Sequence, residues 1–398
     1  MKFLVIRFSS IGDIVLTTPV VRCLKKQVVT AEVHYLTKAS FKPILEANPY
    51  IDKIHCLGGG LAGGAAAGDA AARGAAAGDD LAAVIETLRR EDFDYVIDLH
   101  HNLRTLKVKR GLGKAAFSFE KLNIQKWLLT NFKINRMPDR HIVDRYMDTL
   151  AGFGVKNDGA GLDYFIPAAD ELKPNDIPTA HQAGYVGLVI GAALATKKLP
   201  YHKLVEVCEQ ARHPMILLGG PEDAETGERL AAIDPIKIYN ACGKFNLNES
   251  AGLVRQAKLV VTHDTGLMHI AAAFKRPIVS IWGNTVPEFG MYPYYGENYL
   301  NYFKRTHEQS PFEGTGDIRS GSSVRKDAGV SADTRSGSAV VGEDRNGRFG
   351  KLPHEMMEVK GLSCRPCSKI GYKKCPKGHF KCMEEQPVGR ILQVINPV

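Results

Sequence analysis

One segment of the chain, residues 259–282, has the pattern of a strand, a tight turn, a helix and a second strand. It begins with the apolar run Leu259–Thr262, turns at His263–Gly266 and, after a short apolar helix, ends in the buried run Ile278–Trp282. Short links between strand and helix are typical of a parallel, doubly wound sheet. Ligands bind beyond the carboxyl ends of such strands, which is where the turn falls.

The residues of this turn suit an anion. Asp264 and Thr265 stand where a helix N-cap belongs, Gly266 lies just inside the helix, and His269 follows on the face that looks back at the strand end. First-turn N–H groups and the helix dipole favour negative charge there. An ordinary capped helix has the same residues, so the turn alone leaves both interpretations open.

Similar units fill most of the chain and predict an α/β fold with two Rossmann-like, doubly wound domains facing across a cleft. Low-complexity stretches separate or interrupt them, and these are expected to be flexible because they have few large apolar groups to bury. The expected parts are a first domain at 1–170 with an insert at 58–80, a second domain at 184–304, a disordered insert at 305–350, and a Cys-rich tail with a final helix at 361–398.

Composition limits the partners. The 398 residues carry a formal net charge of +9, which favours phosphorylated substrates or an acidic membrane surface. Aromatic residues make up 8% and do not alternate with basic ones, so no nucleic-acid partner is expected. We find neither a signal-peptide pattern nor an apolar run approaching the roughly 18 residues of a membrane span. We therefore expect a cytoplasmic protein, peripheral on the inner membrane.

The first strand, near residues 2–8, runs into the loop Ser9–Asp13. Gly12 permits close approach of a ligand to the backbone. The carboxylate of Asp13 would face the cleft, where a general base is useful. Asp13 is equally suited to capping the helix that follows.

Two more strand ends of the second domain carry groups that complement the 263–266 turn. Thr196 and Lys197 follow one strand, and a lysine charge there suits a diphosphate. Glu222 follows the next strand and could accept hydrogen bonds from ribose hydroxyls. Each residue alone also fits an exposed loop, but the set predicts a nucleotide-diphosphate site.

Basic residues follow the fourth strand of the first domain. His100 and Arg104 would lie on the acceptor side of the cleft, and the run continues through Lys107, Lys109 and Arg110. Guanidinium and ammonium groups suit a phosphorylated acceptor. A solvated basic helix is the alternative.

Four cysteines cluster near the C-terminus with the spacing C-x2-C-x7-C-x6-C: Cys364, Cys367, Cys375 and Cys382. Four thiolates in about 20 residues allow a tetrahedral structural zinc site. Free buried thiols or a labile disulfide are the alternatives. A zinc-stabilised basic binding protein without catalysis is accordingly the rival function.

The motifs together resemble glycosyltransferase family 9, the ADP-heptose:lipopolysaccharide heptosyltransferase family. The resemblance rests on IRFSSIGDIVLTTPV, FDYVIDLHHNLRT, RHIVDRY, GAALATKKLP, LLGGPED and THDTGLMHIAAAFKRPIVSIWG, together with the tail LSCRPCSKIGYKKCPKGHFKCM. It implies a GT-B fold and metal-independent, inverting sugar transfer without a cofactor. The implied partners are ADP-heptose or another nucleotide-sugar and a lipopolysaccharide inner-core or lipid A type acceptor.

The resemblance also implies roles for the residues above. Asp13 would be the general base, Lys197 with Thr196 would hold the donor phosphates, and Glu222 would bind ribose. The diphosphate and sugar would be held by Asp264, Thr265, Gly266 and His269. The chain departs from the family pattern at Leu199, where an aromatic residue is usual, and in its two inserts.

Overall fold

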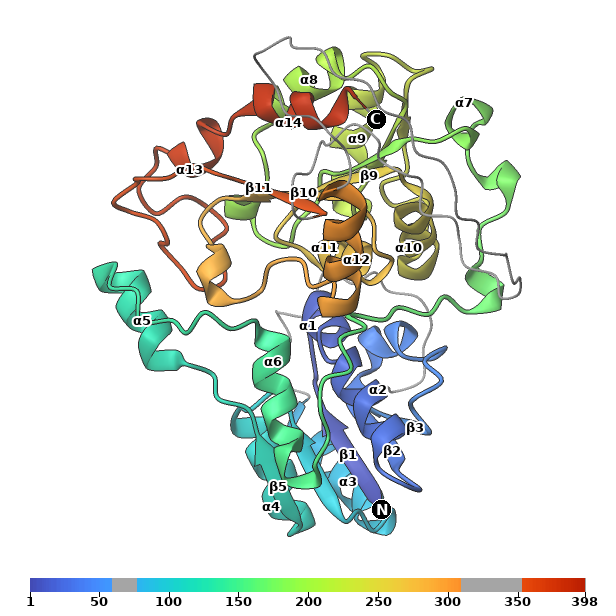
Figure 1. The fold of residues 1–398 in the computed structure, drawn as a ribbon, viewed down its shortest axis with the longest axis vertical. Helices are drawn as coiled ribbons and strands as arrows, with labels where there is room; N and C mark the ends of the chain where they lie inside the picture. Colours follow the sequence, from blue (N-terminus) through green and yellow to red (C-terminus); the bar gives the residue numbers. More distant parts are fainter. Residues whose placement is uncertain (59–76, 309–352, 398) are drawn as a thin grey trace, which may run out of the picture.

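The computed structural model describes residues 1–58, 77–308 and 353–397, which form two α/β domains joined end to end (Figure 1). The N-terminal domain has a five-stranded parallel sheet of order β3-β2-β1-β4-β5. Its strands are β1 Lys2–Ile6, β2 Glu32–Lys38, β3 Lys53–Leu57, β4 Tyr95–Asp98 and β5 Ala115–Ser118. Its helices are α1 Ile11–Val15, α2 Thr18–Gln27, α3 Ala77–Arg90, α4 Leu103–Leu112, α5 Asn123–Phe132 and α6 Ile142–Met147.

Two boundaries in this domain differ from expectation. The helix that was expected to follow Asp13 is divided into α1 and α2, because Pro19 lacks an N–H and so favours a new helix start over a helix interior. α3 begins at Ala77, so the last residues of the expected 58–80 insert are helical. The rest of that insert, and most of the 305–350 insert, lie outside the described residues.

The C-terminal domain has a six-stranded parallel sheet of order β11-β10-β9-β6-β7-β8. Its strands are β6 Val186–Val189, β7 Met215–Leu218, β8 Ile238–Asn240, β9 Leu259–His263, β10 Ile278–Trp282 and β11 His354–Glu358. The helices around it are α7 Thr179–Gln182, α8 Tyr201–Gln210, α9 Ala224–Ala231, α10 Leu247–Gln256, α11 Gly266–Ala273, α12 Glu297–Glu308, α13 Lys381–Glu384 and α14 Val388–Ile395.

Every residue of β9 and β10 is buried, as expected for central parallel strands covered on both faces. The final helix α14 closes one of these faces by packing on α8, where Ile391, Leu392 and Ile395 are buried. Burial of each such side chain contributes about 1.5–3 kcal/mol. The edge strand β11 was not predicted, because its short, partly polar sequence HEMME follows the second insert.

The two domains touch where α1 meets α11, beyond the carboxyl ends of β1 and β9 (Figure 1). A Cβ atom on Gly12 would lie 2.5 Å from His269 Cδ2, and one on Gly266 would lie 2.6 Å from Ile11 Cγ2. Only glycine allows this approach. The two motifs that the sequence analysis placed on opposite sides of a cleft are therefore in direct contact. In the described part of the chain, no helix is long and apolar enough to cross a membrane.

Candidate functional site

Asp13 occupies the third position of α1 and is held by two partners. Its Oδ2 accepts hydrogen bonds from Ser10 N at 3.2 Å and Ser10 Oγ at 2.8 Å, and its Oδ1 pairs with Arg7 Nη2 at 2.7 Å. Burial alone would raise the pKa of Asp13, but the charge of Arg7 and the bonds from Ser10 lower it below its ordinary value. The carboxylate is ionised at neutral pH, and it also serves the capping function that the sequence left open.

Lys197 and Asp264 come from neighbouring strand ends and pair directly. The 3-10 turn Ala195–Lys197 places Lys197 Nζ 2.7 Å from Asp264 Oδ2 and 3.2 Å from Asp264 O. Thr285 Oγ1 donates to the same Oδ2 at 2.9 Å. The carboxylate at the turn is thus compensated by Lys197, so it does not present an unpaired negative charge to a diphosphate.

Thr265 is the N-cap residue of α11, but its hydroxyl contacts Thr262 Oγ1 at 3.3 Å and makes no side-chain cap on the helix. The first-turn N–H groups of α11 are therefore left uncapped by this residue. They lie at the contact between Gly266 and α1, as an anion-binding helix start would.

Two predicted donor-side residues have surroundings that the sequence did not indicate. Thr196 is buried, and its hydroxyl accepts from Tyr372 N at 2.8 Å and donates to Tyr372 O at 3.1 Å, so it anchors the Cys-rich tail. Glu222 lies exposed in the 3-10 turn Pro221–Asp223 that follows β7. Its neighbour Asp223 is buried and pairs with Lys198 at 2.5 Å, a partnership that the sequence analysis missed.

Charged residues from both domains act on the buried ring of His269. It is 2% exposed, and its Nδ1 has no hydrogen-bond partner among the described residues. Burial lowers the pKa of His269 to about 4; Asp264 and Asp13 act to raise it and Lys197 to lower it further. The imidazole is neutral at pH 7, and the charges of all three predicted site residues act on it.

His100 and Arg104 lie together after β4. The His100 ring packs on Phe8 with centroids 5.1 Å apart, and Arg104, which is exposed, lies 5.9 Å from the centroid of the same Phe8 ring. Burial, together with Arg7, lowers the pKa of His100 to about 4. Lys109 instead turns inward to Asp98 at 2.9 Å, so only part of the basic run is available to a ligand.

The sequence analysis did not single out three lysines on the N-terminal side of the interface: Lys121 and Lys126 interact electrostatically with Asp13, and Lys369 of the tail interacts with both of them. Burial lowers the pKa of Lys126 to about 8, and repulsion from Arg145, Lys369 and Lys121 adds to the effect. Burial and Arg7 likewise lower the pKa of Lys121. Cations that repel one another in this way favour an anionic ligand. Lys369 is distant from the other two in the chain, so no sequence pattern joins all three.

A cavity of about 680 Å³ lies in the N-terminal domain, between β5, α5 and α6. Its walls include Phe119, Gln125, Arg136 and Arg145. None of the sequence-predicted site residues lines it. It adds room for part of a large ligand next to the contact between the domains.

The Cys-rich tail contacts both domains. Arg365 donates to Gly283 O at 2.6 Å and to Thr285 O at 3.0 Å, which braces the residue that bonds Asp264. From the N-terminal domain, Lys133 at the end of α5 donates to Pro366 O at 2.7 Å. The tail is therefore part of the site's framework.

The thiols of the tail do not form a closed metal site as they stand. Cys364, Cys367, Cys375 and Cys382 are unpaired by disulfides, and within the described ranges no three of them bring their sulfurs within 4.8 Å of one another. Burial and the neighbouring thiols Cys367 and Cys375 raise the pKa of Cys382 to about 12. The present positions do not fit tetrahedral zinc, and the zinc expectation stays a prediction.

Comparison with known proteins places this arrangement in a family. The model of "Glycosyltransferase family 9 (heptosyltransferase)" matches residues 81–315, more than half of the 398-residue chain. Lipooligosaccharide heptosyltransferase 2 of Haemophilus influenzae is 36% identical over 107 residues, which span 26% of this chain and 31% of that relative. Lipopolysaccharide heptosyltransferase 1 of Campylobacter coli is 24% identical over 305 residues, 72% of this chain and 84% of that one.

A solved structure of the E. coli heptosyltransferase WaaC with ADP has a TM-score of 0.55 and 22% identity, covering 75% of this chain and 92% of that one. At this identity the likeness concerns the fold, which confirms the predicted GT-B architecture of two Rossmann-like domains. The chain belongs to glycosyltransferase family 9.

Proposed function

We propose that this chain is an inverting heptosyltransferase that moves a heptose from ADP-heptose to the inner-core or lipid A region of a lipopolysaccharide. One observation carries the proposal: Gly12, next to Asp13, packs against the buried ring of His269, on which the charges of Asp13, Lys197 and Asp264 all act. A carboxylate base and a diphosphate-binding cation thus lie at one interface. The names of the two relatives, and the ADP in the E. coli structure, support the choice of sugar and nucleotide.

In the proposed reaction, Asp13 accepts the proton of the acceptor hydroxyl. The hydroxyl oxygen forms a bond to the anomeric carbon while the bond from that carbon to the diphosphate breaks, and ADP leaves with the electron pair. Lys197 and the uncapped N–H groups of α11 stabilise the charge on the departing diphosphate. Asp264 and Thr285 hold Lys197 in place. No metal takes part in this transfer.

The acceptor would bind through the unneutralised cations of the other side. Lys121 and Lys126 repel each other and Lys369, and anionic groups of a lipopolysaccharide core would relieve that repulsion. Arg104, exposed above Phe8, would extend this surface. Glu222, exposed in the 3-10 turn Pro221–Asp223 that follows β7, remains the proposed ribose ligand on the donor side.

Helix α5 would hold the protein at the membrane surface where such an acceptor is anchored. It stands away from the rest of its domain (Figure 1), and Ile124, Trp127 and Phe132 on it are 72%, 54% and 57% exposed. Lys126 and Lys133 add positive charge to this helix. Exposed aromatic and aliphatic side chains with basic neighbours favour the interface of an anionic bilayer.

The test is a transfer assay with purified chain, ADP-heptose and a heptose-free lipopolysaccharide acceptor, run beside UDP- and GDP-sugars. We expect sugar transfer from the ADP donor, and a larger thermal shift with ADP than with UDP or GDP. Transfer from another nucleotide-sugar alone would move the chain to a different donor class. Polyanion binding that survives Lys197→Ala, with no transfer from any donor, would favour a binding protein.

A further inference from the structure

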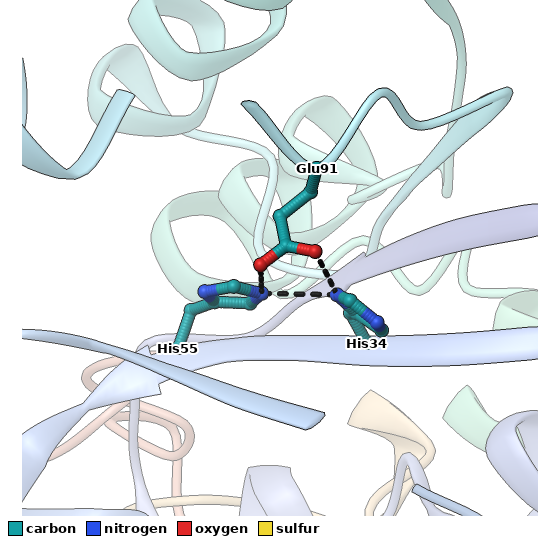
Figure 2. A group of neighbouring side chains, drawn as sticks. All are labelled: His34, His55 and Glu91. Atoms are coloured by element: carbon teal, nitrogen blue, oxygen red, sulfur yellow. Dashed lines mark hydrogen bonds and ion pairs between the residues drawn. The ribbon is translucent and has the colours of Figure 1, made fainter. Parts of the chain in front are cut away.

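Two histidines and a glutamate lie together in the N-terminal domain (Figure 2). His34 is the third residue of β2, His55 is on the neighbouring strand β3, and Glu91 directly follows α3. The two rings are 1% and 7% exposed. None of the three takes part in the proposed transfer, so their juxtaposition needs a separate explanation.

The contact between His34 and Glu32 decides which nitrogen of His34 bears a lone pair. His34 Nε2 lies 2.8 Å from Glu32 Oε1, and an ionised carboxylate only accepts, so Nε2 carries the proton. In the neutral ring Nδ1 is then unprotonated, and it faces His55 Nε2 at 3.0 Å. Two ring nitrogens at this distance need a proton or a cation between them.

Glu91 completes a set of three ligand atoms. Its Oε2 lies 3.8 Å from His34 Nδ1, and its Oε1 lies 4.0 Å from His55 Nε2. The ligand atoms all lie within 4.8 Å of one another, and this is the one such group among the residues that the structure describes. Bonds of 2.0–2.2 Å to a tetrahedral ion separate ligand atoms by roughly 3.3 Å, so small side-chain shifts suffice.

We propose that His34 Nδ1, His55 Nε2 and a Glu91 carboxylate oxygen bind a first-row transition-metal dication, with zinc the expected ion. Two imidazoles and one carboxylate are ligands that suit zinc, and the fourth position would be filled by water. Glu32 supports the site from outside, because a carboxylate bonded to the far nitrogen of a ligating histidine fixes the ring and its tautomer.

Two lysines compete with the ion for Glu91. Lys53 pairs with Glu91 Oε1, and Lys2 Nζ lies 3.6 Å from Oε2. The Lys53 side chain is 54% exposed and can turn into solvent. Lys2 keeps its ion pair with Glu32, whose carboxylate lies 3.2 Å away. Metal binding would therefore release Lys53 and join β2, β3 and the end of α3. An ion that binds only the folded domain stabilises it.

Zinc chloride is titrated into the chelator-treated full-length chain in competition with a chromophoric chelator. The Tm of thermal unfolding is then measured with and without zinc. We expect His55→Gln to lose one zinc equivalent and the zinc-dependent rise in Tm. Glu32→Gln should weaken zinc binding about 10–100-fold. Lys53→Ala should tighten it, because a competitor for Glu91 is gone. His202→Gln is the matched control, since that side chain is 63% exposed and lies on α8.

The thiols of the tail are a second potential zinc source, so a Cys364→Ser, Cys367→Ser double variant is titrated in parallel. The proposal predicts that this variant keeps the equivalent that His55→Gln loses. Equal stoichiometry and affinity in wild type and His55→Gln would overturn it, as would loss of zinc only in the double variant. If His55→Gln does not fold, Glu91→Gln, at a partly exposed turn, gives the same two outcomes.

Discussion

The donor and acceptor sides of the domain interface treat their charges differently. On the C-terminal side each strand-end lysine has its own carboxylate: Lys197 pairs with Asp264 at 2.7 Å and Lys198 with Asp223 at 2.5 Å. On the N-terminal side Lys121 and Lys126 lie among other cations, and their pKa values are lowered by burial and repulsion. The first side is organised before a ligand arrives, and the second gains most when an anion binds.

This difference fits the two substrates proposed. A nucleotide diphosphate is small and always the same, so fixed ion pairs can hold its partners in position at little entropic cost on binding. A lipopolysaccharide acceptor is large and anionic, and uncompensated cations attract it over a distance. When it binds, the repulsion between those cations decreases. Asp13 lies between the two, ionised through Arg7.

The strongest way to break the comparison is to remove Asp13, the proposed general base. Asp13→Asn should lower kcat about 10²–10⁴-fold, the usual contribution of a general base. The thermal shift with ADP should remain, because Asp13 belongs to the other domain. Asp92→Asn, at an exposed turn where Asp92 pairs with Lys114, is the matched control and should transfer normally. Near-normal turnover of Asp13→Asn would rule this carboxylate out as the base.

The second-largest loss of activity should follow from breaking the ion pair between Lys197 and Asp264 on the donor side. Lys197→Ala should lower kcat about 10²–10³-fold, because it removes the cation proposed to stabilise the leaving diphosphate. Asp264→Asn leaves the cation but loosens it, and should cost about tenfold. Lys203→Ala, whose partner is Glu206 at 3.5 Å, serves as control. Steady-state kinetics decide; an equal loss in Lys203→Ala would point to general destabilisation.

Substitution of an exposed aromatic residue on α5 should have an effect of intermediate size, on membrane binding. Trp127→Ser should weaken binding to anionic vesicles about tenfold, the effect of losing part of one buried aromatic side chain. Turnover on a water-soluble acceptor fragment should not change. Ile236→Ser is a fair control, because Ile236 is 79% exposed in the other domain. Vesicle co-sedimentation measures both, and equal weakening by the two variants would remove α5 from the picture.

The smallest effect is a pH dependence on the acceptor side. Lys126 is charged below its pKa of about 8 and neutral above it, so the acceptor KM should rise a few-fold as pH increases through about 8. Lys126→Arg should flatten that rise, since arginine keeps its charge. Lys114→Arg, at a site 38% exposed, should leave it unchanged. A rise that persists in Lys126→Arg would assign it to another group.

The sequence predicted the fold because the fold rests on local patterns, and the same patterns placed the candidate site residues at strand ends. The strand at Ile278–Trp282 agrees with expectation to the residue, since a continuous apolar run bounded by turns leaves little freedom. Gly12 and Gly266 were placed at the ligand-binding ends of their sheets, and they meet.

What the sequence did not indicate depends on contacts between distant segments. The hydroxyl of Thr196 bonds the backbone of Tyr372, which is 176 residues away. Lys369 joins cations from the first third of the chain. The pair His34 and His55 lies on adjacent strands whose register only the sheet defines. No periodicity in the chain encodes such pairs, because tertiary packing alone brings them together.

The reach of the tail has a consequence for how new specificities arise. Lys369 lies in a short loop between Cys367 and Gly371, yet its charge acts on the acceptor side of the opposite domain. Exchanging that loop for the loop of a relative would transplant part of the acceptor preference, while nucleotide choice stayed with the host. In such a scaffold, the range of acceptors can change through the tail loop, where insertions and deletions disturb no strand.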